Sequence, residues 1–83
     1  MDYEIELRPK AWKDLKRVPR SEAARILDRI EGLRHGLVGD VTRLKASAFE
    51  YRLRVGDYRV LFDVEGARVL VWRVRHRREA YSR

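Results

Sequence analysis

The sequence predicts a single α+β domain spanning residues 1–83, in which a two-helix hairpin covers one face of a small sheet. The sheet is expected to be mostly antiparallel, with three strands in the C-terminal half and one N-terminal strand. Three observations support this prediction. The chain is short and 45% hydrophobic, which suits one small core. Apolar residues alternate with polar ones in residues 3–7 and again after residue 49, and they follow helical spacing in between.

The first half of the chain predicts one strand and two helices. Residues 3–7 alternate, so Tyr3, Ile5 and Leu7 are expected to face inward. Pro9 suits the first turn of a helix that ends before Pro19. In this helix Ala11, Trp12, Leu15 and Val18 are expected in the core, and Lys10, Lys13, Asp14, Lys16 and Arg17 are expected to face water. A second amphipathic stripe ends near Gly36 and comprises Ala23, Ile26, Leu27, Ile30, Leu33 and Leu37.

The second half predicts three strands after a loop at residues 39–43. Alternation over residues 49–55 gives one strand, and Gly56-Asp57 is a two-residue hairpin signal. The next strand is expected to place Tyr58, Val60, Phe62 and Val64 inward. Residues 65–67 turn the chain again, and residues 69–75 form the last strand.

Two registers are open for the last strand. A three-residue turn at residues 65–67 points Leu70, Trp72 and Val74 inward, and it places Arg73, Arg75 and Arg77 on the face of Arg54 and Arg59. A two-residue turn instead buries Val69 and Val71 and exposes Trp72. We favour the three-residue turn, because it does not bury Arg73.

The positive charge is concentrated in the C-terminal part of the chain. The net charge is +7, and residues 52–83 contain nine arginines against four acidic residues. Arginine binds phosphate bidentately and stacks on bases. Because these arginines recur at every second strand position, we expect a cationic sheet surface that binds a polyanion, RNA above all.

The hairpin turn places two of these arginines opposite each other. If Gly56-Asp57 forms the whole turn, Arg54 lies directly opposite Arg59, with Arg52 further along the same face. Like charges in opposite positions destabilise a sheet. A bound phosphate would remove the repulsion; the alternative is a shielding carboxylate such as Asp63 or Glu50.

With these features the chain resembles the RelE family of toxins, within the RelE/ParE superfamily of bacterial and archaeal toxin–antitoxin systems. The resemblance covers almost the whole chain. It includes the strand–helix–helix–three-strand order, Leu44-Lys45 before the sheet, the YRLRVGDYRV run at residues 51–60 and the VRHRREAY ending at residues 74–81.

The resemblance implies a small cytoplasmic toxin that cleaves mRNA in the ribosomal A site without a metal or other cofactor. It also implies an antitoxin partner, which we expect to be acidic and helical. The family's active-site positions fall on Arg52, Arg54, Arg59, Arg77 and Tyr81. Lys45, Arg73, Arg75 and Arg78 are further candidates for RNA binding.

Metal-free RNA cleavage needs a base for the 2′-hydroxyl, positive charge on the pentavalent phosphate and an acid for the leaving oxygen. Arg59 and Arg77 suit charge stabilisation, and Arg52 and Arg54 suit the grip on the backbone, with Arg54 sharing in catalysis. Relatives carry lysine at the positions of Arg52 and Arg54, but arginine cannot act as a base. Tyr81 is therefore the first candidate base. His76 follows, since strand parity favours the core side for it, and Lys45 comes third.

Other functional classes compete with this interpretation or are disfavoured by the composition. The same fold in a ParE-like toxin would act on DNA gyrase through protein contacts, and a degenerate member would only bind its antitoxin or RNA. The chain has no cysteine and only two distant histidines, so no metal site is expected. No apolar run approaches the roughly 18 residues that a membrane helix needs, and residues 1–4 do not resemble a signal peptide.

Overall fold

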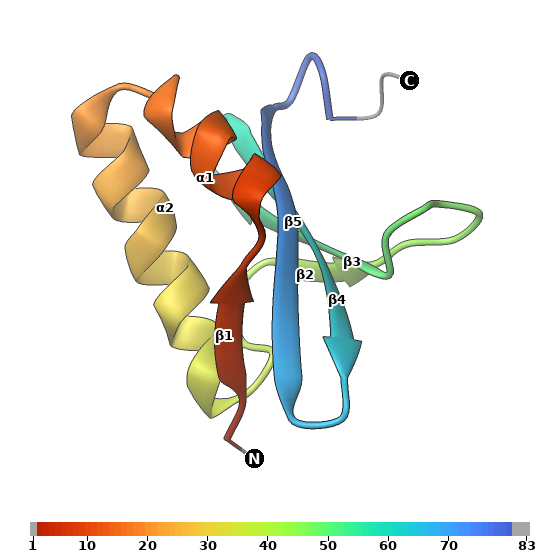
Figure 1. Cartoon of the computed structure of the whole chain (residues 1–83). Coiled ribbons are helices and arrows are strands. Elements are labelled where there is room, and N and C mark those ends of the chain that lie inside the picture. The colour runs from red at the N-terminus through yellow and green to blue at the C-terminus, as the bar shows by residue number, and fades with distance from the viewer. Residues whose placement is uncertain (1, 81–83) are drawn as a thin grey trace.

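Two helices pack on one face of a five-stranded sheet in the computed structural model, which describes residues 2–80 (Figure 1). The elements are β1 (Glu4–Leu7), α1 (Pro9–Lys16), α2 (Arg20–Gly32), the short 3₁₀ helix η1 (Leu33–His35), β2 (Val41–Arg43), β3 (Tyr51–Val55), β4 (Tyr58–Glu65) and β5 (Arg68–His76). None of the helices in residues 2–80 has the length and hydrophobicity of a membrane-spanning segment.

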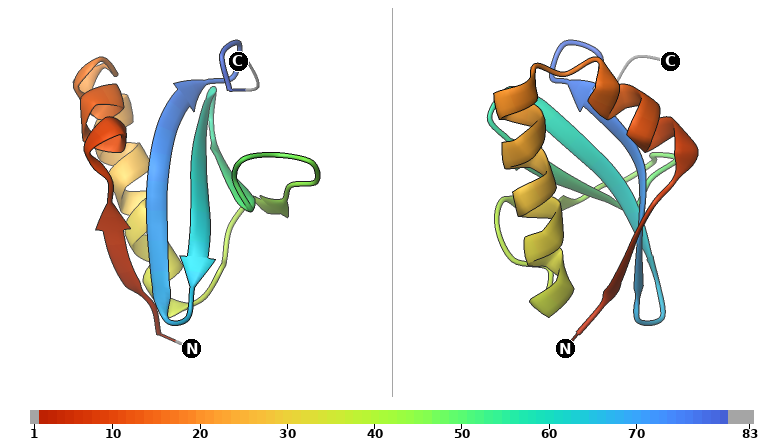
Figure 2. Two further views of the ribbon diagram at one scale, coloured as in Figure 1. Left: turned by 45° about the vertical axis from the view of Figure 1, so that its right-hand side comes forward. Right: turned by 60° about the vertical axis from the view of Figure 1, so that its left-hand side comes forward.

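The strand order in the sheet is β1-β5-β4-β3-β2, with β1 parallel to β5 and all other pairs antiparallel. The helices lie on one side, whereas the loop of residues 44–50 and the C-terminal turn (residues 77–80) lie on the other (Figure 2). We call the side without helices the open face. The α+β prediction with its helix hairpin is confirmed. The predicted loop at residues 39–43 is wrong in part, because Val41–Arg43 pairs with β3 as a short edge strand.

The core lies between the helices and the sheet. Ile26, Ile30 and Leu33 from the second apolar stripe are almost fully buried, against Val60 and Phe62 of β4. Tyr3, Ile5 and Leu7 also pack against this cluster, as predicted. The apolar patterning of the sequence therefore identifies most of the core.

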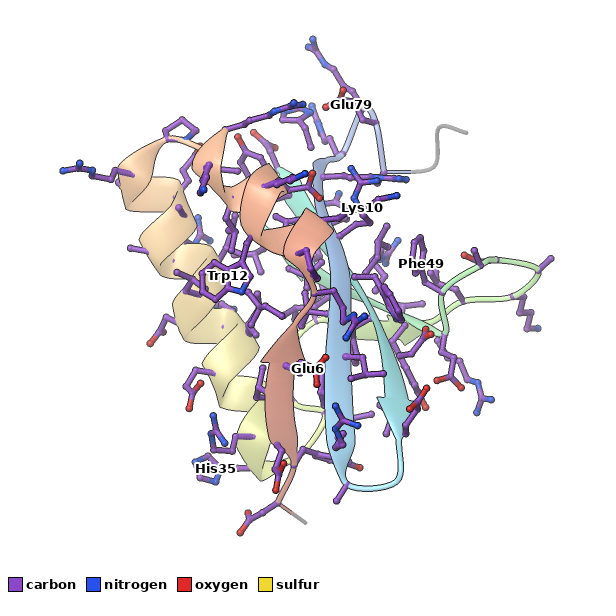
Figure 3. The ribbon with its side chains drawn as sticks, viewed as in Figure 1. Glu6, Lys10, Trp12, His35, Phe49 and Glu79 are labelled. Atoms are coloured by element: carbon purple, nitrogen blue, oxygen red, sulfur yellow. The ribbon has the colours of Figure 1, made fainter. Side chains whose placement is uncertain are left out.

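Trp12 is an exception to the predicted core. Its side chain is 49% exposed and projects from α1 on the helix side of the molecule (Figure 3). The helix has only eight residues, and Ala11 and Leu15 already occupy the positions that face the sheet. The next position around the helix, that of Trp12, consequently lies at the border of the core.

The hairpin between β3 and β4 forms as predicted. Val55 pairs with Tyr58 and Arg54 with Arg59, which leaves Gly56 and Asp57 as the two turn residues. Gly56 has a φ of 58°, a conformation that glycine adopts without steric strain. The turn therefore fixes the register that brings the two arginines together.

The register of β5 differs from the favoured prediction. Glu65 pairs with Arg68 across a two-residue turn, and Val69 and Val71 are fully buried. The pairing then shifts at a β-bulge between Leu61 and Phe62, beyond which Val74 pairs with Val60 in the core. The expectation for Val74 is thus confirmed. Leu70 is buried, but it alternates with Val69 and Val71 and so lies on the opposite face of the sheet from the one predicted, and Trp72 is only partly buried. One strand therefore uses two different alternation frames.

Candidate nucleic-acid interface

Three arginines from three neighbouring strands lie side by side across the open face. Arg54 of β3 pairs with Arg59 of β4, which pairs in turn with Arg75 of β5. Adjacent strands are about 4.8 Å apart, so these side chains start from closely spaced backbone positions. We call Arg54, Arg59 and Arg75 the arginine row. The sequence predicted the Arg54–Arg59 pair and the presence of Arg75 on the same face, and the two-frame register of β5 places Arg75 directly opposite Arg59.

The members of the row differ in their counter-charges. Arg54 Nε lies 2.7 Å from an Asp40 carboxylate oxygen in an exposed ion pair. Arg59 donates to the carbonyl oxygens of Gly56 and Tyr58 at 2.9 and 3.0 Å, and Arg75 donates to the Ala80 carbonyl at 3.4 Å. Among residues 2–80, no carboxylate forms an ion pair with either of these two arginines. Their guanidinium groups donate hydrogen bonds to neutral carbonyl oxygens instead.

The two carboxylates considered as shields serve other donors. Asp63 accepts from the Glu50 N–H at 2.8 Å and from the Trp72 indole Nε1–H at 3.2 Å. The Glu50 carboxylate accepts from the Val64 N–H at 2.9 Å. Both groups tie the loop of residues 44–50 to β4 and β5. Asp40 is the carboxylate that shields part of the row.

Two more candidates belong to the same side of the molecule. Arg52 pairs with Leu61 and shares the strand parity of Arg54; its guanidinium donates to Thr42 Oγ1 at 3.1 Å. Lys45 is exposed in the loop of residues 44–50, which projects beside the open face (Figures 1 and 2). Phe49 lies between this loop and the sheet (Figure 3). The loop and the C-terminal turn thus flank the arginine row.

The remaining predicted cations lie outside the row. Arg73 takes a position in β5 on the same face as Arg59, as expected, because it pairs with Leu61. Its guanidinium, however, donates two hydrogen bonds to the Asp14 carboxylate, at 2.8 and 3.0 Å, and is therefore already paired with an acid. Arg77 follows the end of β5, where its Nε lies 3.8 Å from Asp57 Oδ1. Arg78 is exposed in the C-terminal turn. Arg59 and Arg77 were the two residues expected to stabilise the charge on the phosphate. The structure places Arg59 in the row, whereas Arg77 lies just beyond the end of β5.

His76 lies on the other side of the sheet from the row. Its ring meets the Tyr58 ring edge-on at 5.5 Å, and Tyr58 packs against the core. The Nδ1 atom accepts a hydrogen bond from the Arg78 N–H at 3.2 Å. Burial, and then the Glu22 carboxylate, raise the pKa of the Tyr58 phenol, which keeps it neutral. Tyr81, the first candidate base, lies outside the described residues.

A pocket of about 210 Å³ adjoins the row at the free edge of β5. It lies between the end of α1 and the C-terminal turn, and Arg17, Tyr58, Arg75, His76 and Glu79 are among its lining residues. Arg75 therefore borders both the pocket and the open face. Within residues 2–80, no group of histidine, aspartate and glutamate side chains could hold a metal ion.

Sequence reasoning missed Asp14, which it placed in solvent with the neighbouring lysines. The Asp14 side chain is only 13% exposed, and its carboxylate also accepts the Val74 N–H at 2.9 Å. The available signal was weak: Asp14 is the only acidic residue among the cations of α1. A contact with β5 could not be inferred from that alone.

The small mixed sheet, with a helix hairpin on one face and a cationic row on the other, has the arrangement that the sequence resemblance implies for small α+β toxins. The family model described as ParE toxin of the type II toxin–antitoxin system parDE matches residues 5–81. The chain therefore belongs to the RelE/ParE family of type II toxins, as the sequence resemblance indicated.

Named relatives agree with this assignment. Toxin RelE3 of Methanocaldococcus jannaschii is 36% identical over 75 residues, which are 84% of this chain and 85% of the relative. The RelB–RelE antitoxin–toxin complex of Methanococcus jannaschii contains a similar chain, with a TM-score of 0.76 and 33% identity over 90% of this chain and 93% of that one. The archaeal RelE–RelB complex of Pyrococcus horikoshii gives a TM-score of 0.79 and 26% identity, over 96% of this chain and 100% of that one.

Proposed function

We propose that this toxin is a ribosome-dependent endoribonuclease that cleaves mRNA in the A site and thereby stops translation. The observation that carries the proposal is the arginine row, in which Arg59 and Arg75 have no described carboxylate as ion-pair partner. Adjacent like charges destabilise a folded protein unless an anion binds between them. An RNA phosphate satisfies this arrangement, and the RelE names of the relatives favour mRNA as its source.

The row suits the charge that develops during cleavage. The 2′-oxygen attacks the adjacent phosphorus, the pentavalent phosphate gains negative charge, and the bond to the 5′-oxygen breaks. Arg59 and Arg75 would stabilise that charge, while Arg52 and Arg54 would hold the backbone. We assign to Arg75 the role that the resemblance gave to Arg77, because Arg75 lies opposite Arg59 within the sheet.

Proton transfer places different demands on the site. An arginine cannot accept the 2′-hydroxyl proton at neutral pH. Tyr58 lies on the helix side of the sheet and has a raised pKa, and His76 uses Nδ1 to accept a backbone N–H. We keep Tyr81 as the proposed general base, because the resemblance places it in the active site and a phenol close to guanidinium groups has a lowered pKa.

The proposal includes partners and a location. The two solved relatives are complexes of RelE with RelB. We propose that a cognate antitoxin, acidic and helical, binds this chain and neutralises its cationic surface, and that the free toxin acts on ribosomes and mRNA in the cytoplasm.

End mapping of mRNA tests the activity. Expression of the wild-type chain in a translation extract is expected to produce new mRNA ends at A-site codons. Arg59→Ala and Arg75→Ala are expected to abolish them. Arg68→Ala is the matched control, because Arg68 lies on β5 at the opposite end of the strand and pairs with Glu6. Intact messages while the wild-type chain arrests translation would refute the proposal.

The description of the matching family model favours a second candidate function. ParE toxins of parDE systems give the model its description, and such a toxin would poison DNA gyrase. A supercoiling assay with purified gyrase separates the two functions. Inhibition by the wild type that persists in Arg59→Ala and Arg75→Ala would favour the gyrase target.

A further inference from the structure

The β-bulge in β5 determines which side chains this strand presents to each face. Val69 and Val71 face the core, so uninterrupted alternation would also direct Arg73 into the core. Instead, Phe62 pairs with Val71 and Leu61 with Arg73, which leaves Trp72 as the extra residue. The bulge returns Val74 to the core and places Arg75 opposite Arg59. The position of Arg75 in the arginine row therefore depends on the bulge.

Asp14 contacts the strand directly after this bulge. Strand β1 ends with Leu7, which pairs with Val71, so β1 does not extend along β5 beyond that point. There the Asp14 carboxylate accepts the Val74 N–H at 2.9 Å and receives Arg73 Nε and Nη2 at 2.8 and 3.0 Å. One carboxylate thus takes the place of a neighbouring strand and binds the first two residues after Trp72.

The surroundings of Asp14 favour its ionised form. Burial alone would raise the pKa of Asp14, but the hydrogen bonds from Arg73 and from the Val74 N–H outweigh burial and hold it below its ordinary value. Asp14 in turn raises the pKa of Arg73. The positive charge of Arg75 also contributes to lowering the pKa of Asp14, so the two side chains are close enough to interact.

We infer that Asp14 is a positioning residue, which holds the bulge of β5 in the register that aligns Arg75 with Arg59 for RNA binding. Asp14 need not touch RNA, because it acts through the backbone of Val74 and through Arg73. The inference deepens the proposed function and rests on it for its effect on RNA.

The test compares Asp14→Asn with Glu31→Gln, both measured as full-length folded protein. Glu31 forms an ion pair with Arg34 at 2.6 Å on the helix side, so its substitution removes the same charge elsewhere. Loss of an acid from a basic protein favours RNA binding in general. We expect the opposite for Asp14→Asn: about tenfold weaker binding of a 2′-deoxy-substituted, uncleavable RNA oligonucleotide, whereas Glu31→Gln stays within about twofold of wild type.

A double-mutant cycle separates positioning from a merely structural role. In an Arg75→Ala background, Asp14→Asn is expected to change RNA affinity less than about twofold, because its effect passes through Arg75. The Val74 amide should exchange its hydrogen about tenfold faster in Asp14→Asn than in Glu31→Gln. An equal loss of affinity in both backgrounds, or an unchanged Val74 exchange rate, would overturn the inference.

A further variant and the choice of readouts keep the test decisive. If Asp14→Asn does not fold, Arg73→Gln serves instead, since it keeps the hydrogen bond that the Val74 N–H donates to Asp14 and removes only the guanidinium. Its expected loss of affinity is smaller than that of Asp14→Asn and is again absent in the Arg75→Ala background.

Two outcomes separate the inference from the proposed function. Absence of mRNA cleavage by the wild type would refute the proposed function alone. Failure of Arg75→Ala to weaken RNA binding would refute the role of Asp14.

Discussion

Substitution of Arg59 is expected to change how RNA binding depends on salt. Arg59 is the central member of the arginine row, with Arg54 and Arg75 as its neighbours across the sheet. Each arginine that neutralises a phosphate of a single strand contributes about −0.7 to the slope of log K against log salt. The ion pair of Arg54 with Asp40 is exposed and can exchange for phosphate at little cost.

The magnitude follows from the number of arginines in the row. The three contacts of the row contribute about −2.1 to the slope, which corresponds to an about 18-fold fall in affinity between about 50 and 200 mM salt. Arg59→Ala should reduce this contribution to about −1.4 and the corresponding fall to about sevenfold. Fluorescence anisotropy with a labelled, uncleavable RNA oligonucleotide measures both slopes.

Arg68→Ala provides the control for this measurement. Arg68 is an exposed arginine seven residues before Arg75 in β5, about 23 Å along the strand. That separation exceeds the Debye length of about 10 Å at 0.1 M salt. The slope of Arg68→Ala should therefore equal that of the wild type. The reasoning is refuted if Arg59→Ala leaves the slope unchanged, or if Arg68→Ala reduces it equally.

Three further predictions concern stability. Phe62 is fully buried, and its ring stacks on that of Tyr51 with 5.3 Å between the centroids. Phe62→Ala should therefore lower the free energy of unfolding by about 3–5 kcal/mol in urea titrations, and an unchanged urea midpoint would contradict its place in the core. Gly56→Ala should destabilise by about 1 kcal/mol or more, because φ is 58° and the new Cβ would lie 3.2 Å from the Arg25 guanidinium; Gly32→Ala, in open helical space, should not destabilise. The lowered pKa of Asp14 contributes stability that is present above the unfolded value of about 3.9 and is lost as pH falls through the folded value. Unfolding at pH 6 and pH 3 should consequently show a smaller difference for Asp14→Asn than for wild type, and an equal difference would contradict the assignment.

Local signals in the sequence predict most of the fold. Alternation identifies β3 and β4, and Gly56-Asp57 fixes the pairing of Arg54 with Arg59, because a two-residue turn permits one register. The apolar stripe of α2 identifies the helix face that packs on the sheet. These features depend on residues close together in sequence, and a single chain contains that information.

The remaining features depend on contacts between distant segments. The bulge at Trp72 is stabilised by Asp14, almost sixty residues earlier in the chain, so alternation within β5 could not indicate it. Because the sequence does not reveal the bulge, it also does not show which of Arg73, Arg75 and Arg77 lies opposite Arg59. Strand β2 has three residues, too few for a periodic pattern. Its pairing with β3 decides its conformation.

The position of β5 in the sheet has a consequence for when the toxin becomes complete. This strand lies between β1 and β4, although it is the last of the five to be synthesised. Neither the parallel pairing with β1 nor the contact with α1 can form until β5 has left the ribosome that makes it. A nascent chain that lacks β5 has Arg54 and Arg59 but not Arg75. The translating ribosome is thus exposed to a complete arginine row only after β5, the last strand of the sheet in chain order, has been synthesised.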